Sequence, residues 1–304
     1  MSSTKAIAAI GRNPATHTVG DGFPVRSIFS YDLGPGTSPF LLLDYAGPVD
    51  FPPSDRQRGV EAHPHRGFET VTIVFAGELE HRDSAGHHGT IGPGDVQWMT
   101  AASGVLHEEK HTAEFTRRGG SLEMIQLWVN LPAKEKMRPP GYQTLLNREI
   151  PSVTLAADMG VVRVIAGEFQ RTEGPARTFT PVNLWDMHLK AGARAALPFP
   201  DGHNAAVLVR RGRLQLNDSQ VIVPPEFALF ERRGDQIVVE ALEDADVLLL
   251  SGAAIDEPIA AGGPFVMNTR EEVRQAFDDY RQGRIGRAAR HADAGAGEGE
   301  GYLK

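Results

Sequence analysis

Seven of the eleven histidines lie between residues 63 and 111, and the first two of them form the pair His63-Pro64-His65. Side chains alternate along a β-strand, so residues two apart point to the same face. His107 and a carboxylate further along the chain can join this pair if the intervening segment folds back as hairpins. Three imidazoles and one carboxylate are a mixed nitrogen and oxygen donor set that suits Fe(II), Mn, Ni, Cu or Zn. The spacing predicts a metal site.

The carboxylate of this site has two candidates. Glu109 lies two residues after His107 and shares its strand face, whereas Glu108 points away. Glu69 follows His65 in an H-x-H-x3-E pattern and competes with Glu109. The spacing alone leaves both acids open.

The remaining histidines of this region have simpler interpretations. His81, His87 and His88 fall in a predicted hairpin and are expected to be exposed. His111 continues the face of His107 and is expected to be an outer or surface group. The chain contains no cysteine, which excludes disulfides, thiolate metal ligands and cysteine nucleophiles.

The elements that must position these residues are short strands rich in β-branched residues and separated by glycine turns. Their spacing indicates a barrel or sandwich. The polar, proline-rich segment 132–142 is expected to connect two such units. Strands are expected at 27–47, 69–75, 78–83, 96–99 and 122–131, and again at 161–165, 182–189, 206–210, 213–216, 236–241 and 247–251.

One helix is well marked near the C-terminus. Thr269 and Glu272 form a capping box, and apolar residues follow at helical spacing from Val273 to Tyr280. Beyond it, residues 291–304 contain too little apolar material to pack and are expected to be flexible.

Charge and hydropathy exclude several classes of protein. A formal charge of −8 and a pI near 5.8 argue against direct nucleic-acid binding. There is no apolar run long enough to span a membrane and no signal-peptide core, so the expected location is the cytoplasm.

Several segments resemble the pirin family, a branch of the cupin superfamily. The similar stretches together span roughly residues 20–286: His63 to Val71, Gly94 to Ala101, Gly104 to His107, Leu127 to Leu131, Glu135 to Met137 and Gly263 to Thr269.

The resemblance implies an all-β bicupin, in which two antiparallel jelly-roll barrels face each other and a short C-terminal helix follows. We expect a metal-binding cupin domain at residues 1–138, a cupin domain without a metal site at 139–290 and a tail at 291–304. The family pattern assigns the metal ligands to His63, His65, His107 and Glu109, and thereby favours Glu109 over Glu69. It implies one divalent ion, Fe(II) first, with Mn, Ni, Cu, Co or Zn as alternatives.

Three functions remain open on this basis. The first is a dioxygenase similar to quercetin 2,3-dioxygenase, which opens a flavonol ring with O2 and releases carbon monoxide, with Glu109 as the general base. The second is a non-enzymatic regulator whose metal state controls binding to a protein partner. The third is a metal enzyme of another reaction type, because cupins support several chemistries.

Overall fold

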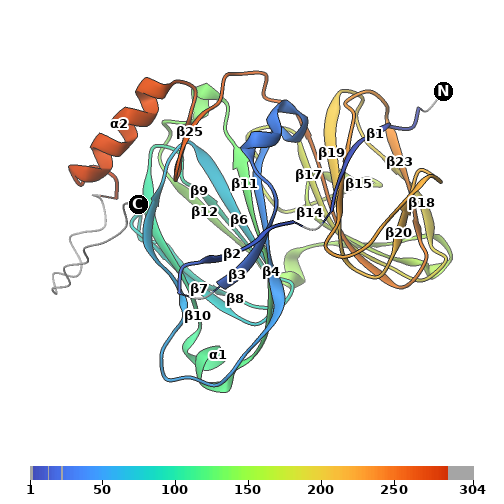
Figure 1. Cartoon of the computed structure of the whole chain (residues 1–304), viewed down its shortest axis with the longest axis horizontal. Coiled ribbons are helices and arrows are strands. Elements are labelled where there is room, and N and C mark those ends of the chain that lie inside the picture. The colour runs from blue at the N-terminus through green and yellow to red at the C-terminus, as the bar shows by residue number, and fades with distance from the viewer. Residues whose placement is uncertain (1–2, 13, 22, 287–304) are drawn as a thin grey trace.

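The chain folds into two β-barrels that stand side by side (Figure 1). The computed structural model describes residues 3–12, 14–21 and 23–286, so the predicted tail at 291–304 lies outside the described residues. Each barrel consists of a seven-stranded and a four-stranded antiparallel sheet. The predicted all-β fold with two barrels and a short C-terminal helix is confirmed.

The first barrel carries all four residues of the predicted site. Its seven-stranded sheet has the order β12 (Gly141–Leu145), β9 (Val96–Thr100), β6 (Phe68–Ala76), β11 (Gly120–Asn130), β4 (Phe40–Phe51), β3 (Phe23–Phe29) and β2 (Thr16–Val19). Its four-stranded sheet has the order β5 (Gly59–His65), β10 (Val105–His111), β7 (Leu79–Asp83) and β8 (His88–Ile91).

The second barrel repeats this plan strand for strand. Its larger sheet has the order β1 (Ile7–Gly11), β22 (Phe227–Phe230), β19 (His203–Arg211), β24 (Ala245–Ala253), β17 (Val182–Leu189), β14 (Gly160–Ala166) and β13 (Ser152–Thr154). The smaller sheet has the order β18 (Arg194–Pro198), β23 (Gln236–Ala241), β20 (Leu214–Leu216) and β21 (Gln220–Ile222).

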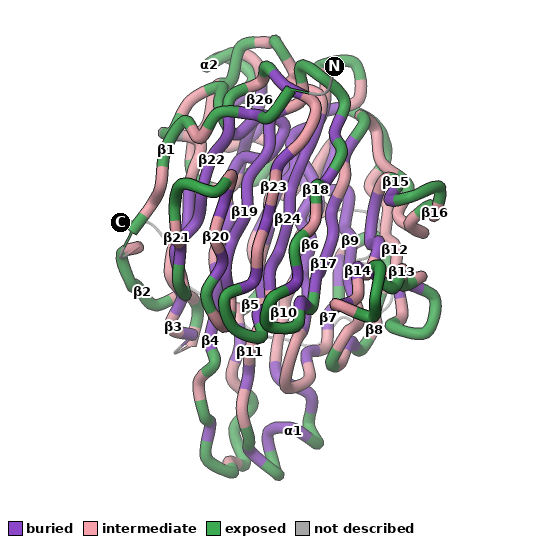
Figure 2. The backbone as a smooth tube through the Cα atoms, turned by 90° about the vertical axis from the view of Figure 1, so that its right-hand side faces the viewer, coloured by how far each residue is buried: buried purple, intermediate pink, exposed green. Residues whose placement is uncertain are grey.

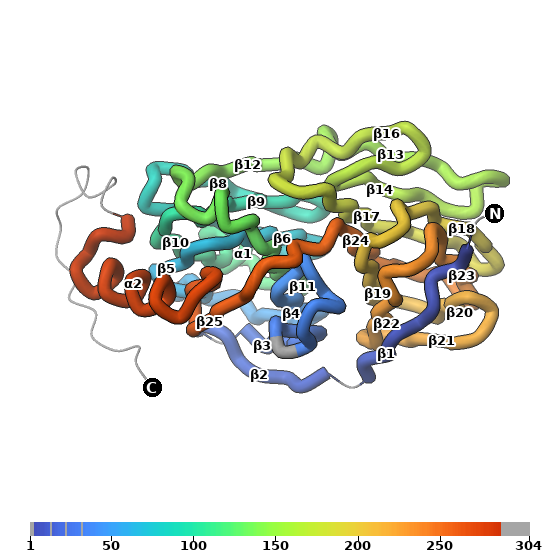
Figure 3. Tube along the Cα trace, turned by 90° about the horizontal axis from the view of Figure 1, so that it is seen from above, coloured from blue at the N-terminus to red at the C-terminus, as the bar shows by residue number. Residues whose placement is uncertain are grey.

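The two halves of the chain exchange segments. Strand β1 pairs with β22 of the second barrel, and β12 pairs with β9 of the first (Figure 3). The hairpin of β25 (Ala260–Gly262) and β26 (Phe265–Met267) and the helix α2 (Arg270–Arg281) lie against the first barrel. The domain division at residue 138 stays a prediction, and each barrel contains segments from both sides of it.

The two larger sheets pack face to face through a shared apolar core. Residues of both barrels belong to it, among them Val71, Ile73 and Trp98 from the first and Leu184 and Leu248 from the second. Figure 2 shows the buried strands gathered at the centre of the molecule, with exposed residues in the loops around them.

The helical elements are few and short. Helix α2 begins with the predicted capping box, because Thr269 Oγ1 accepts from the amide of Glu272. No helix among the described residues is long and apolar enough to cross a membrane. The other short elements are α1 (Ala113–Arg118), the 3-10 turns at Tyr31–Thr37, Ala133–Glu135, Asn147–Glu149 and Ala156–Asp158, and the strand pair β15 (Glu168–Phe169) and β16 (Thr172–Glu173).

Candidate metal centre

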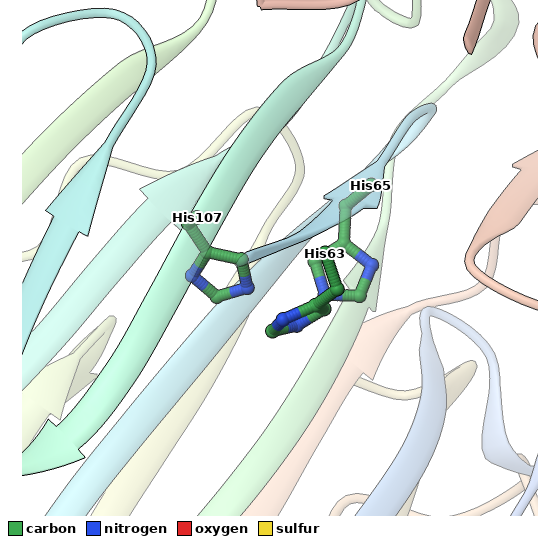
Figure 4. A group of neighbouring side chains, drawn as sticks. All are labelled: His63, His65 and His107. Atoms are coloured by element: carbon green, nitrogen blue, oxygen red, sulfur yellow. The ribbon is translucent and has the colours of Figure 1, made fainter. Parts of the chain in front are cut away.

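Three imidazoles converge inside the first barrel. His63 and His65 lie two residues apart on β5, and antiparallel pairing places His107 of β10 opposite His63. One ring nitrogen from each of the three lies within 4.8 Å of the other two. Figure 4 shows the three rings turned toward one another. The H-x-H spacing therefore brings both imidazoles to one face, as predicted.

Carbonyl oxygens fix the ring orientation of two of these histidines. His63 Nδ1 lies 2.8 Å from the carbonyl oxygen of Glu61, and His65 Nδ1 lies 3.4 Å from that of Pro264. A carbonyl oxygen only accepts, so each Nδ1 carries the proton and each Nε2 keeps its lone pair. This tautomer is ready to bind a metal ion through Nε2.

The three imidazoles are held in the neutral form. Burial lowers the pKa of His63 and holds the pKa values of His65 and His107 well below the ordinary value, and the charge of neighbouring imidazoles acts in the same direction on the latter two. His107 is only 1% exposed, and its Nε2 has no hydrogen-bond partner within the described part of the chain. Neutral, closely spaced imidazoles with a buried free nitrogen fit a divalent cation.

The Glu109 carboxylate is held by two neighbours on the larger sheet. Thr72 Oγ1 donates to Glu109 Oε1 over 2.8 Å, and Gln97 Nε2 donates to the same oxygen over 3.1 Å. A Glu109 oxygen also forms a second compact group with ring nitrogens of His81 and His107, all within 4.8 Å of one another. Both groups share His107, so Glu109 stands at the edge of the three-histidine cluster.

His81 is a residue of this site that sequence reasoning missed. The prediction that it is exposed is wrong, because its exposed fraction is 3%. Its Nδ1 accepts from Gln97 Nε2 over 2.9 Å, and its Nε2 lies 3.4 Å from Asp83 Oδ2. Its position directly opposite Glu109 in the β7–β10 pairing explains this burial. The H-x-D spacing of His81 and Asp83, which puts both on one strand face, was the available signal.

The other histidines of the hairpin behave differently. His88 is exposed as predicted, and His87 is half-buried, with its Nδ1 donating to Asp83 Oδ2 over 2.9 Å. His111 was expected to be an outer or surface group, but it is 2% exposed. Its ring packs edge-on against three phenylalanines: Phe23, Phe51 and Phe115.

The competing acid Glu69 faces away from the cluster. It is an odd-numbered residue of β6, as are Val71 and Ile73 of the core between the barrels, whereas Thr72 faces Glu109. Its carboxylate accepts from Thr100 Oγ1 over 2.7 Å. Strand alternation therefore places Glu109, and not Glu69, on the side of the histidine cluster.

A row of polar residues crosses the larger sheet beneath the cluster. Successive strand pairings connect Ser27, Asp44, Gln126, Thr72 and Gln97, one from each of five neighbouring strands. Thr72 bridges the row to Glu109, and Ser27 Oγ donates to Asp44 Oδ1 over 2.6 Å. Polar side chains in the middle of a sheet normally form hydrogen bonds, as Thr72 and Ser27 do here.

A cavity of about 280 Å³ lies beside the imidazoles. Most of its lining is apolar and includes Phe23, Leu42 and Trp128. Its polar lining residues are Asp44, His63, His65, Glu109 and Gln126. An apolar chamber with a few converging polar groups, close to the lower limit of the roughly 300–1,000 Å³ range of ligand sites, suits a small molecule.

The C-terminal segment completes the wall of this cavity. Pro264 lines it and accepts from the backbone amide of Arg66 over 3.3 Å, and the amide of Val266 donates to the carbonyl oxygen of Arg66 over 3.0 Å. Gly67 has φ +91°, and a Cβ there would lie 1.9 Å from the Val266 carbonyl oxygen, so this close approach requires glycine. Arg66 also donates to Asp279 of α2 over 2.7 Å in a partly buried ion pair.

A two-barrel fold with a histidine cluster in one barrel defines a bicupin. The sequence model described as Pirin matches residues 22–129, and the one described as Pirin C-terminal cupin domain matches residues 184–286. The chain belongs to the pirin family.

Three relatives show how close this relationship is. A Pseudomonas aeruginosa protein named "Putative quercetin 2,3-dioxygenase PA2418" is 56% identical over 93% of this chain and 99% of its own length. Human Pirin is 38% identical over 82% of this chain and 83% of its own. The crystal structure of an Acinetobacter baumannii quercetin 2,3-dioxygenase matches with a TM-score of 0.91 and 48% identity, covering 93% of this chain and 99% of that one.

Proposed function

We propose that this protein is a metal-dependent dioxygenase that opens the central ring of a flavonol such as quercetin with O2 and releases carbon monoxide. The observation that carries the proposal is the cluster of three neutral imidazoles and Glu109 at the wall of an apolar cavity. The relatives named quercetin 2,3-dioxygenase support the choice of substrate class.

In this proposal the metal ligands are His63, His65, His107 and Glu109, and the ion is Fe(II) or another divalent ion of similar preference, such as Mn, Ni, Co, Cu or Zn. When bound, a divalent ion acts as a Lewis acid that lowers the pKa of a substrate hydroxyl. The buried Nε2 of His107 and the tautomers of His63 and His65 suit this role.

The chain's own residues supply the remaining requirements. Glu109 accepts the proton of the flavonol 3-hydroxyl, which leaves an electron-rich anion that reacts with O2. Thr72 and Gln97 donate to Glu109 Oε1, so they orient the carboxylate. The apolar walls around Phe23, Leu42 and Trp128 limit the access of water to the anion.

Oxygen uptake with quercetin tests this function. The apoprotein is loaded anaerobically with Fe(II), Mn(II), Ni(II), Co(II) or Cu(II) in turn, and wild type is compared with Glu109→Gln and His63→Ala. We expect metal-dependent uptake with equimolar carbon monoxide, lost in both variants. Absence of uptake with every metal, although the ion is bound, would contradict the proposal and favour the regulatory function.

A further inference from the structure

Asp44 is a half-buried carboxylate on the cavity wall that the proposed chemistry does not use. It lines the same cavity as His63 and Glu109 but lies on β4 of the larger sheet, whereas the histidines lie on strands of the smaller sheet. Acids are rarely placed on a mostly apolar wall without a partner, because burying a charge is costly.

The structure gives the Asp44 carboxylate a single hydrogen bond from the described residues, and that bond is to Oδ1. Ser27 Oγ donates it over 2.6 Å. Burial raises the pKa of Asp44, and Ser27 and the charge of His17 only partly offset this effect. Oδ2 has no hydrogen-bond donor among the described residues, so a donor on a ligand can bind to it.

The distance from Asp44 to the predicted reaction site suits a ligand longer than one ring. Asp44 and Thr72 flank Gln126 in adjacent strands, so their backbones are two strand spacings, or about 10 Å, apart. Thr72 donates to Glu109. A flat molecule that offers one hydroxyl to Glu109 can therefore present a second hydroxyl toward Asp44.

We propose that Asp44 accepts a hydrogen bond from a second phenolic hydroxyl of the substrate, remote from the one that reacts, and thereby selects polyhydroxylated flavonols. This proposal rests on the proposed function and names the specificity residue of the same site. Asp44 is a binding residue, and the carbon–oxygen chemistry remains with the histidine cluster and Glu109.

Anaerobic binding separates this role from turnover. The metal-loaded protein is titrated with quercetin and with 3-hydroxyflavone, which keeps only the reacting hydroxyl, and dissociation constants are measured by calorimetry. The variants are Asp44→Asn, which removes the charge, and Asp44→Leu, which removes the acceptor. Asp50→Asn is the matched control, because Asp50 lies exposed on the same strand outside the cavity.

We expect wild type and Asp50→Asn to prefer quercetin. The quercetin affinity should fall about tenfold in Asp44→Asn and further in Asp44→Leu, the loss typical of a hydrogen bond to a charged group, with 3-hydroxyflavone binding unchanged. An equal loss for both flavonols, an unchanged preference, or no quercetin binding to wild type would overturn the role of Asp44. A preference that depends on Asp44 in a protein that consumes no O2 would overturn the proposed function alone.

Discussion

The two barrels share one architecture but fill it differently. In the first barrel, His107 of β10 pairs with His63 on one side and Asp83 on the other. In the second barrel, Val239 occupies the equivalent position on β23, between Ala195 and Leu216. The register thus replaces the histidine cluster with aliphatic residues.

The larger sheets differ in the same way. The polar row across the first sheet has a counterpart in the second that is entirely apolar and buried. Successive pairings there connect Val164, Trp185, Leu249, Val207 and Ala228, all members of the core of the second barrel.

This difference shows how the fold separates stability from chemistry. A barrel interior that holds polar residues and a cavity gives up the close packing that stabilises a core. The second barrel keeps that packing, and the apolar layer between the two sheets joins the barrels. His188 and His203, the histidines described in the second barrel, reflect this: His188 Nδ1 donates to Asp246 at the surface, and His203 begins β19.

The largest effect we expect is on metal binding, when His107 of the first barrel and the equivalent Val239 of the second are each replaced by alanine. His107→Ala should lower the affinity for a divalent ion by more than about 100-fold, beyond the range typical of residues that only support a ligand. Val239→Ala should leave the affinity unchanged, because the described residues of its barrel form no comparable group of metal-binding side chains. Competition with a chelating dye measures both. Wild-type affinity in His107→Ala would place the ion elsewhere.

Folding stability should depend more on the second barrel than on the first, the opposite of metal binding. Leu249→Ala should destabilise the protein by about 2–5 kcal/mol, because it opens a cavity in a fully buried core. Gln126→Ala, the equivalent change on β11 of the first barrel, borders an existing cavity and should cost about 1 kcal/mol. Denaturant unfolding followed by fluorescence measures both, and similar losses would contradict the division of roles between the barrels.

The sequence predicts the part of the site that depends on strand periodicity. Alternation with period two was enough to place His63 with His65 and Glu109 with His107. The helix was equally readable, because the capping box of Thr269 and Glu272 is local. In each case the information lies within a few residues of the chain.

The remainder depends on strand register, which the local sequence does not contain. The burial of His81 follows from its place opposite Glu109, and the polar row follows from five strands aligned side by side. Pro264 reaches His65 only because the end of the second half of the chain folds back over the first barrel. The exchanged strands β1 and β12 likewise cross the division at residue 138.

The last effect we expect depends on pH, and it comes from Glu69, the acid on the other face of β6. Burial raises the pKa of Glu69 from 4.5 to about 7, with the hydrogen bond from Thr100 acting against the shift. Because the folded pKa lies above the unfolded one, the stabilising effect of the neutral acid is complete below about pH 4.5 and is lost as the pH rises to about 7.

The difference in unfolding free energy between wild type and Glu69→Gln isolates this group, because other titrating groups are common to both. We expect that difference to shift against wild type by up to roughly 3 kcal/mol between the two pH limits and then to stay flat. Val207→Ala, a change in the apolar row of the second barrel, should give a difference that does not vary with pH. If the difference between wild type and Glu69→Gln did not vary with pH, the Glu69 carboxylate would be solvated within the apolar layer between the two larger sheets. Glu69 would then add no pH dependence to folding.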